Sequence, residues 1–338
     1  MLTFDIKPYE LVFNKPAKTS RNVFEVRKVF VVSLFDSTNG RKGIGEAAPL
    51  SLLSIDDIPN YEEILKEKAT LFCSNQDFNE LELDRFPSIR FGLETAFLDL
   101  KSTEGRLFET PFTKGDAVIP INGLVWMNDT ERMYQEALQK IDAGFKVIKF
   151  KVGAQDFDDE CRMLERIRSH YSAFKITIRL DANGAFKPDE AAEQLKELKR
   201  FEIHSIEQPI AKDNWDEMEE LCYERIIDVA LDEELIGVSV EKHGYQLLNH
   251  LKPQYIILKP NLLGGLSKSD EWISLANNLN IKWWATSALE GNIGLSAIAQ
   301  WVSKYETQLH QGLGTGSLFK NNFKSPLQLE KGVMSFKV

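Results

Sequence analysis

The sequence predicts an α/β protein built on a closed (β/α) barrel and preceded by a smaller α+β unit. From about Val118 onward, short apolar segments alternate with amphipathic ones, which indicates parallel strands joined by helical crossovers. Seven or eight such units in about 200 residues are typical of a barrel. An open doubly wound sheet is the alternative, but the Gly-x-Gly-x-x-Gly turn that would favour it is absent.

The barrel strands are expected in short runs that are rich in apolar residues. Amphipathic helices lie between them, for example over Thr130–Ala143, Pro188–Lys199 and Trp215–Cys222, and Pro188 suits the first position of a helix. The predicted strands are Ile119–Leu124, Val147–Val152, Ile176–Asp181, His204–Glu207, Asp228–Asp232, Tyr255–Lys259 and Lys282–Thr286.

The first part of the chain has a different pattern. Val29–Phe35 is an apolar, β-rich run that predicts a strand, and Pro59–Phe72 and Pro87–Ser102 have the apolar spacing of helices. The last residues follow the barrel and are expected to return to this α+β unit. The predicted division is therefore 1–115 together with about 315–338 as one domain, and 116–314 as the barrel domain.

Composition restricts the class of protein. A formal net charge of −10 disfavours nucleic acid and anionic membrane surfaces as partners, and a small-molecule carboxylate substrate would need a local cationic site. No run of 18 apolar residues and no signal sequence is present. Cys73, Cys161 and Cys222 are odd in number and lack a C-x-x-C spacing, which favours a reducing, cytoplasmic location. The sequence leaves a homo-oligomer open.

Charged residues stand at the carboxyl ends of five consecutive predicted strands. Counted from Lys151, the next four of these residues follow at steps of 30, 26, 25 and 27 residues. Each step is about the length of one strand, one helix and two loops. They therefore fall on one face of the barrel, the face where barrel enzymes place their active sites. In chain order, with a second lysine on the first of these strands, they are Lys149, Lys151, Asp181, Glu207, Asp232 and Lys259.

The three carboxylates predict a metal site. Asp181, Glu207 and Asp232 would repel one another on adjacent strands unless a cation lies between them. Ligands that are all oxygen favour a hard cation, so Mg²⁺ is expected, with Mn²⁺ as an alternative. Asn183 lies two residues after the first carboxylate and could support the ligands or face the substrate.

The lysines predict proton transfer. Lys149 and Lys151 are two residues apart on a strand, so both side chains point to the same face, and each can lower the pKa of the other. Lys259 lies across the barrel. A metal that binds a carboxylate, with a lysine as base, suits removal of the proton on the adjacent carbon. Each feature alone has an ordinary explanation, such as a solvated strand edge or a helix cap, but the five strand ends together favour an active site.

The chain resembles the enolase superfamily in its muconate-lactonising subgroup. The resemblance implies a modified TIM-type (β/α)7β barrel with an N-terminal α+β capping domain that the C-terminal segment completes. It also implies Asp181, Glu207 and Asp232 as metal ligands, with Lys151 as the base and Lys259 on the opposite face of the substrate. The matching strings are Lys149-Phe-Lys151, Leu180-Asp-Ala-Asn-Gly184, Ile206-Glu-Gln-Pro209, Leu231-Asp-Glu-Glu234, Leu258-Lys-Pro-Asn261 and Gly43-Ile-Gly-Glu46.

Within this subgroup the chain is most similar to the o-succinylbenzoate synthase family. That likeness implies a Mg²⁺-dependent hydro-lyase, which dehydrates 2-succinyl-6-hydroxy-2,4-cyclohexadiene-1-carboxylate in menaquinone biosynthesis. Lys151 would be base and then acid, Lys149 would tune it, and Lys259 would face the enediolate as a cation. The strings that carry the likeness are Pro87-Ser-Ile-Arg-Phe-Gly-Leu-Glu-Thr95, Thr286-Ser-Ala-Leu-Glu-Gly-Asn-Ile-Gly294 and His310-Gln-Gly-Leu-Gly-Thr-Gly316.

Two further segments are candidates for substrate binding. Ser287 to Gly294 joins a strand end to a helix start, where backbone N–H groups bind anions, so Ser287 and Gly291 could seat the succinyl carboxylate. An ordinary turn is the alternative. The basic loop Lys15–Arg27 resembles the superfamily's capping loop, and Arg21 could reach the site, although a solvated surface loop fits equally well.

Other activities of the subgroup remain as alternatives. An N-succinylamino acid racemase or a dipeptide epimerase needs lysines on both faces, and Lys151 and Lys259 would supply them. A dipeptide epimerase is expected to carry Asp-x-Asp after the eighth strand, but Gly312–Gly316 contains no acidic residue. A barrel that has lost catalysis would be expected to lack a ligand or a lysine, and all of them are present.

Overall fold

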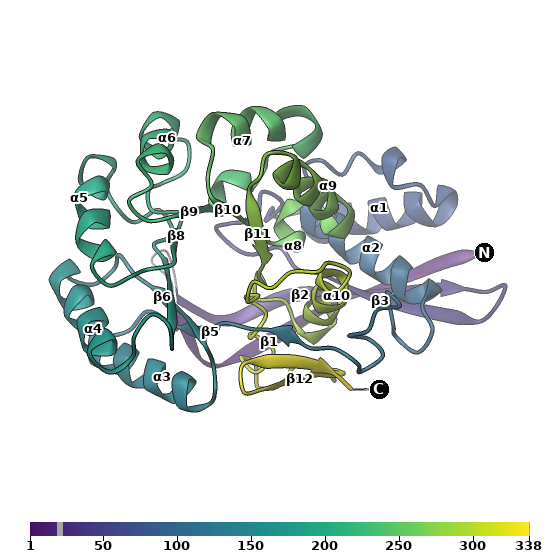
Figure 1. Ribbon diagram of the computed structural model, residues 1–338. Helices are drawn as coiled ribbons and strands as arrows, with labels where there is room; N and C mark the ends of the chain where they lie inside the picture. The colour runs from purple at the N-terminus through teal and green to yellow at the C-terminus, as the bar shows by residue number, and fades with distance from the viewer. Residues whose placement is uncertain (19–22, 338) are drawn as a thin grey trace.

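The computed structural model describes residues 1–18 and 23–337 and contains three sheets (Figure 1). One sheet is antiparallel and N-terminal, the second has seven parallel strands, and the third is a small sheet that includes the C-terminal strands. In the described part of the chain, no helix is long and apolar enough to cross a membrane.

The N-terminal unit is an antiparallel sheet covered by two helices. Its strands are β1 (Leu2–Lys18), β2 (Val23–Asp36) and β3 (Arg41–Ala47), and its helices are α1 (Tyr61–Asn75) and α2 (Pro87–Lys101). A short 3₁₀ helix, Phe78–Leu81, lies between the helices. Apolar residues from β1, β2, α1 and α2 form a core of their own, so this unit has the predicted α+β character.

Glycines let β3 lie directly against α2. A Cβ atom at Gly43 would be 2.1 Å from the carbonyl oxygen of Ala96, and one at Gly45 would be 2.1 Å from that of Gly92. Because no side chain fits between strand and helix here, the Gly43-Ile-Gly-Glu46 string serves close packing. The next residue, Glu46, is carried toward the barrel and is completely buried.

The seven parallel strands form the barrel, in the spatial order β11-β10-β9-β8-β7-β6-β5. On β6 all five residues are buried, because one face meets the surrounding helices and the other lines the barrel interior. This confirms the predicted barrel and cap. The strands are β5 (Gly123–Val125), β6 (Val147–Lys151), β7 (Thr177–Asp181), β8 (Ser205–Glu207), β9 (Val229–Leu231), β10 (Tyr255–Leu258) and β11 (Lys282–Ala285).

The segment at residues 311–312 closes the ring. Gly312 bridges Thr286 in parallel just past β11, and Gln311 bridges Ile121 in parallel just before β5. The predicted strand Ile119–Leu124 is accordingly divided, because β4 (Ile119–Pro120) leaves the ring and pairs with a C-terminal strand. The eighth position of the barrel is therefore filled by a very short extended segment.

Helices surround the barrel on its outside (Figure 1). Asp129 and Asp156 cap two of them by accepting hydrogen bonds from backbone N–H groups, and Pro188 occupies a first position, as predicted. Short 3₁₀ and π segments cover Glu233–Leu235 and Val240–Gly244. The helices are α3 (Thr130–Asp142), α4 (Phe157–His170), α5 (Pro188–Lys199), α6 (Trp215–Glu224), α7 (Tyr245–Leu251), α8 (Pro260–Leu263), α9 (Gly265–Asn278) and α10 (Asn292–Val302).

The C-terminal segment contacts both parts of the molecule. Phe319 bridges Phe13 of β1, whereas β12 (Leu327–Glu330) and β13 (Val333–Phe336) pair with each other and with β4. An apolar cluster that includes Leu11, Leu262 and Leu289 fills the junction between cap and barrel. The domain division at residue 115 stays a prediction.

Candidate active site

The strand register brings the predicted site residues together at one end of the barrel. Lys151 is paired with Asp181, and Asp181 is paired with Glu207, across neighbouring parallel strands. Asp232 directly follows β9, and Lys259 directly follows β10. The alternation of strand residues explains why Lys149 and Lys151 both enter the barrel while their neighbour Phe150 packs outward in the main core.

The lysines form ion pairs with the carboxylates. Lys149 Nζ lies 2.7 Å from Asp181 Oδ2 and 2.5 Å from Glu207 Oε2. Lys151 Nζ lies 2.6 Å from Asp181 Oδ2. On the other side, Lys259 pairs with Asp232, and its Nζ lies 3.8 Å from Glu207 Oε1. Three ammonium groups therefore balance three buried carboxylates.

Burial and charge together set the protonation of this network. Burial would raise the pKa of Asp181, but Lys149 and Lys151 outweigh it and hold that pKa well below its usual range. Burial, aided by Asp181, raises the pKa of Glu207 to about 7, and burial raises the pKa of Asp232. Burial would lower the pKa of Lys149 and Lys259, yet the carboxylates outweigh it and both pKa values lie above their usual range.

The carboxylates offer the donor set of a hard divalent cation. Among the described residues, no group of three His, Cys, Asp or Glu side chains is arranged to hold a metal, since ammonium groups lie among the carboxylates. Glu207 Oε1 is nevertheless buried with no hydrogen-bond partner in the described chain. An orphaned carboxylate oxygen between two further carboxylates fits a cation ligand, so the residue types are compatible with Mg²⁺.

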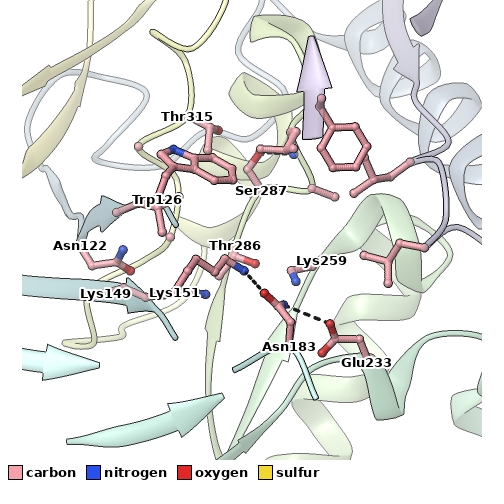
Figure 2. Close-up of a pocket in the computed structure, with 18 of the residues that line it drawn as sticks. Asn122, Trp126, Lys149, Lys151, Asn183, Glu233, Lys259, Thr286, Ser287 and Thr315 are labelled. Carbon is pink, nitrogen blue, oxygen red and sulfur yellow. Dashed lines mark hydrogen bonds between the residues drawn. The ribbon is translucent and has the colours of Figure 1, made fainter. Parts of the chain in front are cut away.

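Asn183 connects the site to a residue that sequence reasoning did not single out. Lys151 Nζ donates to Asn183 Oδ1 at 2.7 Å, and Asn183 Nδ2 donates to Glu233 Oε1 at 3.1 Å (Figure 2). Glu233 lies next to Asp232, within the Leu231-Asp-Glu-Glu234 string, but nothing in a single sequence distinguishes it from Glu234. Asn183 thus holds the ammonium group of Lys151 together with Asp181.

The site opens into a pocket between barrel and cap. The pocket comprises about 950 Å³ of empty space, part of it open to solvent, and Lys149, Lys151 and Lys259 line its floor. Residues from the cap cover one side, including Phe24 and the segment 50–53. Sequence reasoning missed this apolar wall, because the two segments approach the barrel only through the tertiary fold. It also missed the pocket residues Asn122, Trp126, Thr286 and Thr315.

The predicted binding site for a substrate carboxylate already forms hydrogen bonds with other groups of the protein. Ser287 lines the pocket, but its hydroxyl donates to Glu290 Oε2 at 2.6 Å and accepts from Leu289 N at 2.9 Å. The N–H of Gly291 donates to Glu46 Oε1 at 2.6 Å, so the anion at this helix start is a cap residue. The substrate role expected for Gly291 is not supported, and Arg21 lies outside the described residues.

Comparisons with known proteins agree with this geometry. Residues 132–337 match the family model described as enolase C-terminal domain-like. The chain is 40% identical to an o-succinylbenzoate synthase from Desulfotalea psychrophila, over 96% of both chains. It is 23% identical to an L-Ala-D/L-Glu epimerase from Bacillus subtilis, over 95% of this chain and 87% of the relative.

Solved structures extend the comparison. The crystal structure of MenC from Desulfotalea psychrophila superposes with a TM-score of 0.85 and 36% identity, covering 99% of both chains. A muconate lactonizing enzyme from Pseudomonas fluorescens, with 20% identity, shares the fold at a TM-score of 0.82, over 98% of this chain and 93% of that one. The chain belongs to the enolase superfamily of enzymes, in its muconate-lactonising branch.

Proposed function

We propose that this enzyme is an o-succinylbenzoate synthase, a hydro-lyase acting on 2-succinyl-6-hydroxy-2,4-cyclohexadiene-1-carboxylate. The observation that carries the proposal is the placement of Lys151 and Lys259 on opposite sides of three buried carboxylates. The 40% identity with an o-succinylbenzoate synthase over 96% of the chain supports the choice of substrate. A base beside a bound carboxylate is what removal of an α-proton requires.

Each residue has a part in the proposed reaction. Asp181, Glu207 and Asp232 would hold Mg²⁺, or alternatively Mn²⁺, which supplies positive charge to the substrate carboxylate as its α-carbon becomes negative. Lys151 in its free-amine form takes the α-proton onto Nζ, and it thereby becomes an ammonium group like the one that donates to Asp181 and Asn183 in the structure. Lys259 stays an ammonium group and faces the other side of the electron-rich carbon skeleton.

The second half of the reaction returns the proton. The C–O bond to the ring hydroxyl breaks, and Lys151 Nζ gives its proton to the departing oxygen, so water leaves and the ring becomes aromatic. No proton is gained or lost overall. Asn183 and Asp181 both contact Lys151 Nζ and would direct it toward the substrate. Lys149, paired with Asp181 and Glu207, would hold those carboxylates in place.

The direct test is loss of the substrate's ultraviolet absorbance on addition of enzyme and Mg²⁺. Lys151→Ala is expected to slow turnover by at least about 10²- to 10⁴-fold, the usual contribution of a general base. Removal of the metal with EDTA should abolish turnover. Lys146→Ala, an exposed lysine just before the same strand, is the matched control and should retain activity. No turnover by folded wild-type enzyme with Mg²⁺ would refute the proposal.

A racemase acting on N-succinylamino acids is the second candidate. It is favoured by the same observation, because two lysines on opposite faces permit proton exchange from either side. Deuterium uptake by an N-succinylamino acid in D₂O tests it, and loss of uptake for each enantiomer in Lys151→Ala or Lys259→Ala would identify the base for each face. A dipeptide epimerase is disfavoured, since Thr315 lines the pocket where that enzyme needs acidic residues.

We propose that the enzyme works in the cytoplasm. Cys73, Cys161 and Cys222 are free thiols, which supports a reducing, cytoplasmic location. We also propose a small carboxylate as the partner molecule, consistent with a lysine-lined pocket. Size-exclusion chromatography with light scattering would determine whether the chain forms a homo-oligomer.

A further inference from the structure

The mouth of the barrel has two chemically different halves. The ends of β6 to β10 carry the carboxylates and the lysines described above. The remaining part, from the end of β11 through residues 312–315 to the start of β5, contributes neutral residues to the pocket. The neutral half is therefore the part of the barrel mouth that can contact a portion of the substrate away from the lysines.

Three polar groups in the neutral half are buried with no partner. Thr286 Oγ1, Thr315 Oγ1 and Asn122 Oδ1 make no hydrogen bond to any described residue. Their residues are only 4%, 6% and 3% exposed, and all three line the pocket (Figure 2). Buried polar groups are nearly always hydrogen-bonded, because leaving them unpaired is unfavourable. Three such groups in one pocket point to a ligand that completes their hydrogen bonds.

The backbone brings these three groups close together. Gly312 bridges Thr286, and a Cβ atom at Gly312 would lie 2.5 Å from Thr286 Cγ2. A Cβ atom at Gly314 would lie 3.7 Å from the carbonyl oxygen of Asn122. Thr286, the segment 312–315 and Asn122 are therefore neighbours around the closing strand, and Gly312 permits the close approach of two backbone segments there.

Two polar groups of the neighbouring segment 287–291 are already engaged by the protein itself. The Ser287 hydroxyl is committed to Glu290 and Leu289, and the N–H of Gly291 is committed to Glu46. The hydroxyls of Thr286 and Thr315 can each donate one hydrogen bond. The amide of Asn122 can donate as well, since exchange of its oxygen and nitrogen by a 180° turn presents Nδ2 to the pocket.

We propose that Thr286, Thr315 and Asn122 form the binding site for the distal carboxylate of the substrate's succinyl arm. This inference rests on the proposed function and gives its substrate specificity a structural cause. The distal carboxylate is recognised by neutral donors, and the reacting carboxylate by the charged half. Two hydroxyls and one amide can together donate to both oxygens of a carboxylate at the end of the acyl arm.

The test compares two ligands that differ only at the end of the arm. One is o-succinylbenzoate, and the other is o-butanoylbenzoate, in which a methyl group replaces the distal carboxylate. Calorimetry with the Mg²⁺-loaded enzyme gives the dissociation constant of each. We expect Thr286→Val and Thr315→Val, which remove a hydroxyl with little change of shape, each to weaken o-succinylbenzoate by about 10- to 100-fold. The dissociation constant of o-butanoylbenzoate should change by less than about threefold, which also shows that the variants are folded.

Conservative variants sharpen the test. Thr286→Ser and Thr315→Ser keep the hydroxyl and are expected to recover most of the lost affinity for o-succinylbenzoate. Equal weakening of both ligands by the valine variants would overturn the proposal, because it would indicate a general packing defect. Unchanged affinity for both would overturn it too, because the hydroxyls would then bind only solvent.

The outcome for the wild-type enzyme separates the two levels of inference. If it neither turns over the cyclohexadiene substrate nor binds o-succinylbenzoate, the proposed function fails and the arm site fails with it. If it does both, but the valine variants still prefer o-succinylbenzoate over o-butanoylbenzoate as strongly as wild type, only the arm site is wrong.

Discussion

The carboxylate of Glu46 accepts a hydrogen bond from the backbone N–H of Gly291 across 245 residues of sequence. A second hydrogen bond comes from the N–H of Gly294, so a side chain of the cap occupies the amino end of α10 in the barrel. Arg27 is buried beside it and donates to the carbonyl oxygens of Ala48 and Pro49. Cap and barrel are thus joined by a buried polar network directly behind the pocket wall.

The Glu46 contact predicts a pH-dependent contribution to stability. Burial raises the pKa of Glu46 to about 7 from an ordinary value of 4.5. A group with a raised folded-state pKa stabilises the fold fully below its unfolded pKa, and that contribution is lost as pH rises through the folded pKa. Between pH 4.5 and pH 8, wild type should therefore lose up to about 3 kcal/mol of stability relative to Glu46→Gln, which cannot ionise.

Urea unfolding of both proteins across this pH range measures the difference directly. The free energy of unfolding of each is expected to change with pH, since other groups titrate, so the difference between the two proteins is the informative quantity. A difference that stays constant from pH 4.5 to pH 8 would show that Glu46 titrates normally.

The close packing of β3 on α2 predicts a severe effect of adding one methyl group. Gly45→Ala would place Cβ 2.1 Å from the carbonyl oxygen of Gly92, so strand and helix must separate. We expect a loss of about 3 kcal/mol or more in the free energy of unfolding. Lys42→Ala, an exposed position on the same strand, is the control and should leave the midpoint of urea unfolding unchanged. A Gly45→Ala protein as stable as the control would contradict this packing.

The orphaned oxygen of Glu207 predicts a loss of metal-linked stability. A metal that binds only the folded state stabilises it by about 2.7 kcal/mol at 100 times its dissociation constant. Mg²⁺ should therefore raise the Tm of wild type, and Glu207→Gln should largely abolish the rise, because an amide is a weak ligand for Mg²⁺. Differential scanning calorimetry with EDTA and with Mg²⁺ compares them. An equal rise in both proteins would place the metal elsewhere.

The buried ion pairs of Lys149 predict a different dependence on metal. Lys149→Met leaves Asp181 and Glu207 without the ammonium group between them, and loss of one partner in a buried ion pair is unfavourable by about 3–5 kcal/mol. In EDTA the variant should unfold at clearly lower urea concentration, and Mg²⁺ should restore much of the loss by supplying positive charge. Lys196→Met, which removes an exposed pair on α5, should unfold as wild type does under both conditions.

The sequence by itself determined the barrel and the residue types at its mouth. Alternation of apolar strands and amphipathic helices is a local, periodic signal, and it identified the strands that became β6 to β11. Parallel strands bring their carboxyl ends together whatever the details of packing, so Lys151, Asp181, Glu207 and Lys259 had to converge. One strand was misjudged, because Pro120 ends β4 and the segment from Ile121 turns into the ring.

Only the tertiary structure decided which partner each side chain meets. The sequence of the Ser287–Gly294 segment predicts an anion site whether the anion is a substrate or a side chain. In the structure the group bound there is the carboxylate of Glu46, which β3 carries to the amino end of α10. Glu233, the apolar cap wall and the unpaired hydroxyls of Thr286 and Thr315 were likewise invisible in the sequence. Local patterns record how a segment folds, whereas hydrogen bonding and burial depend on distances between segments that lie hundreds of residues apart.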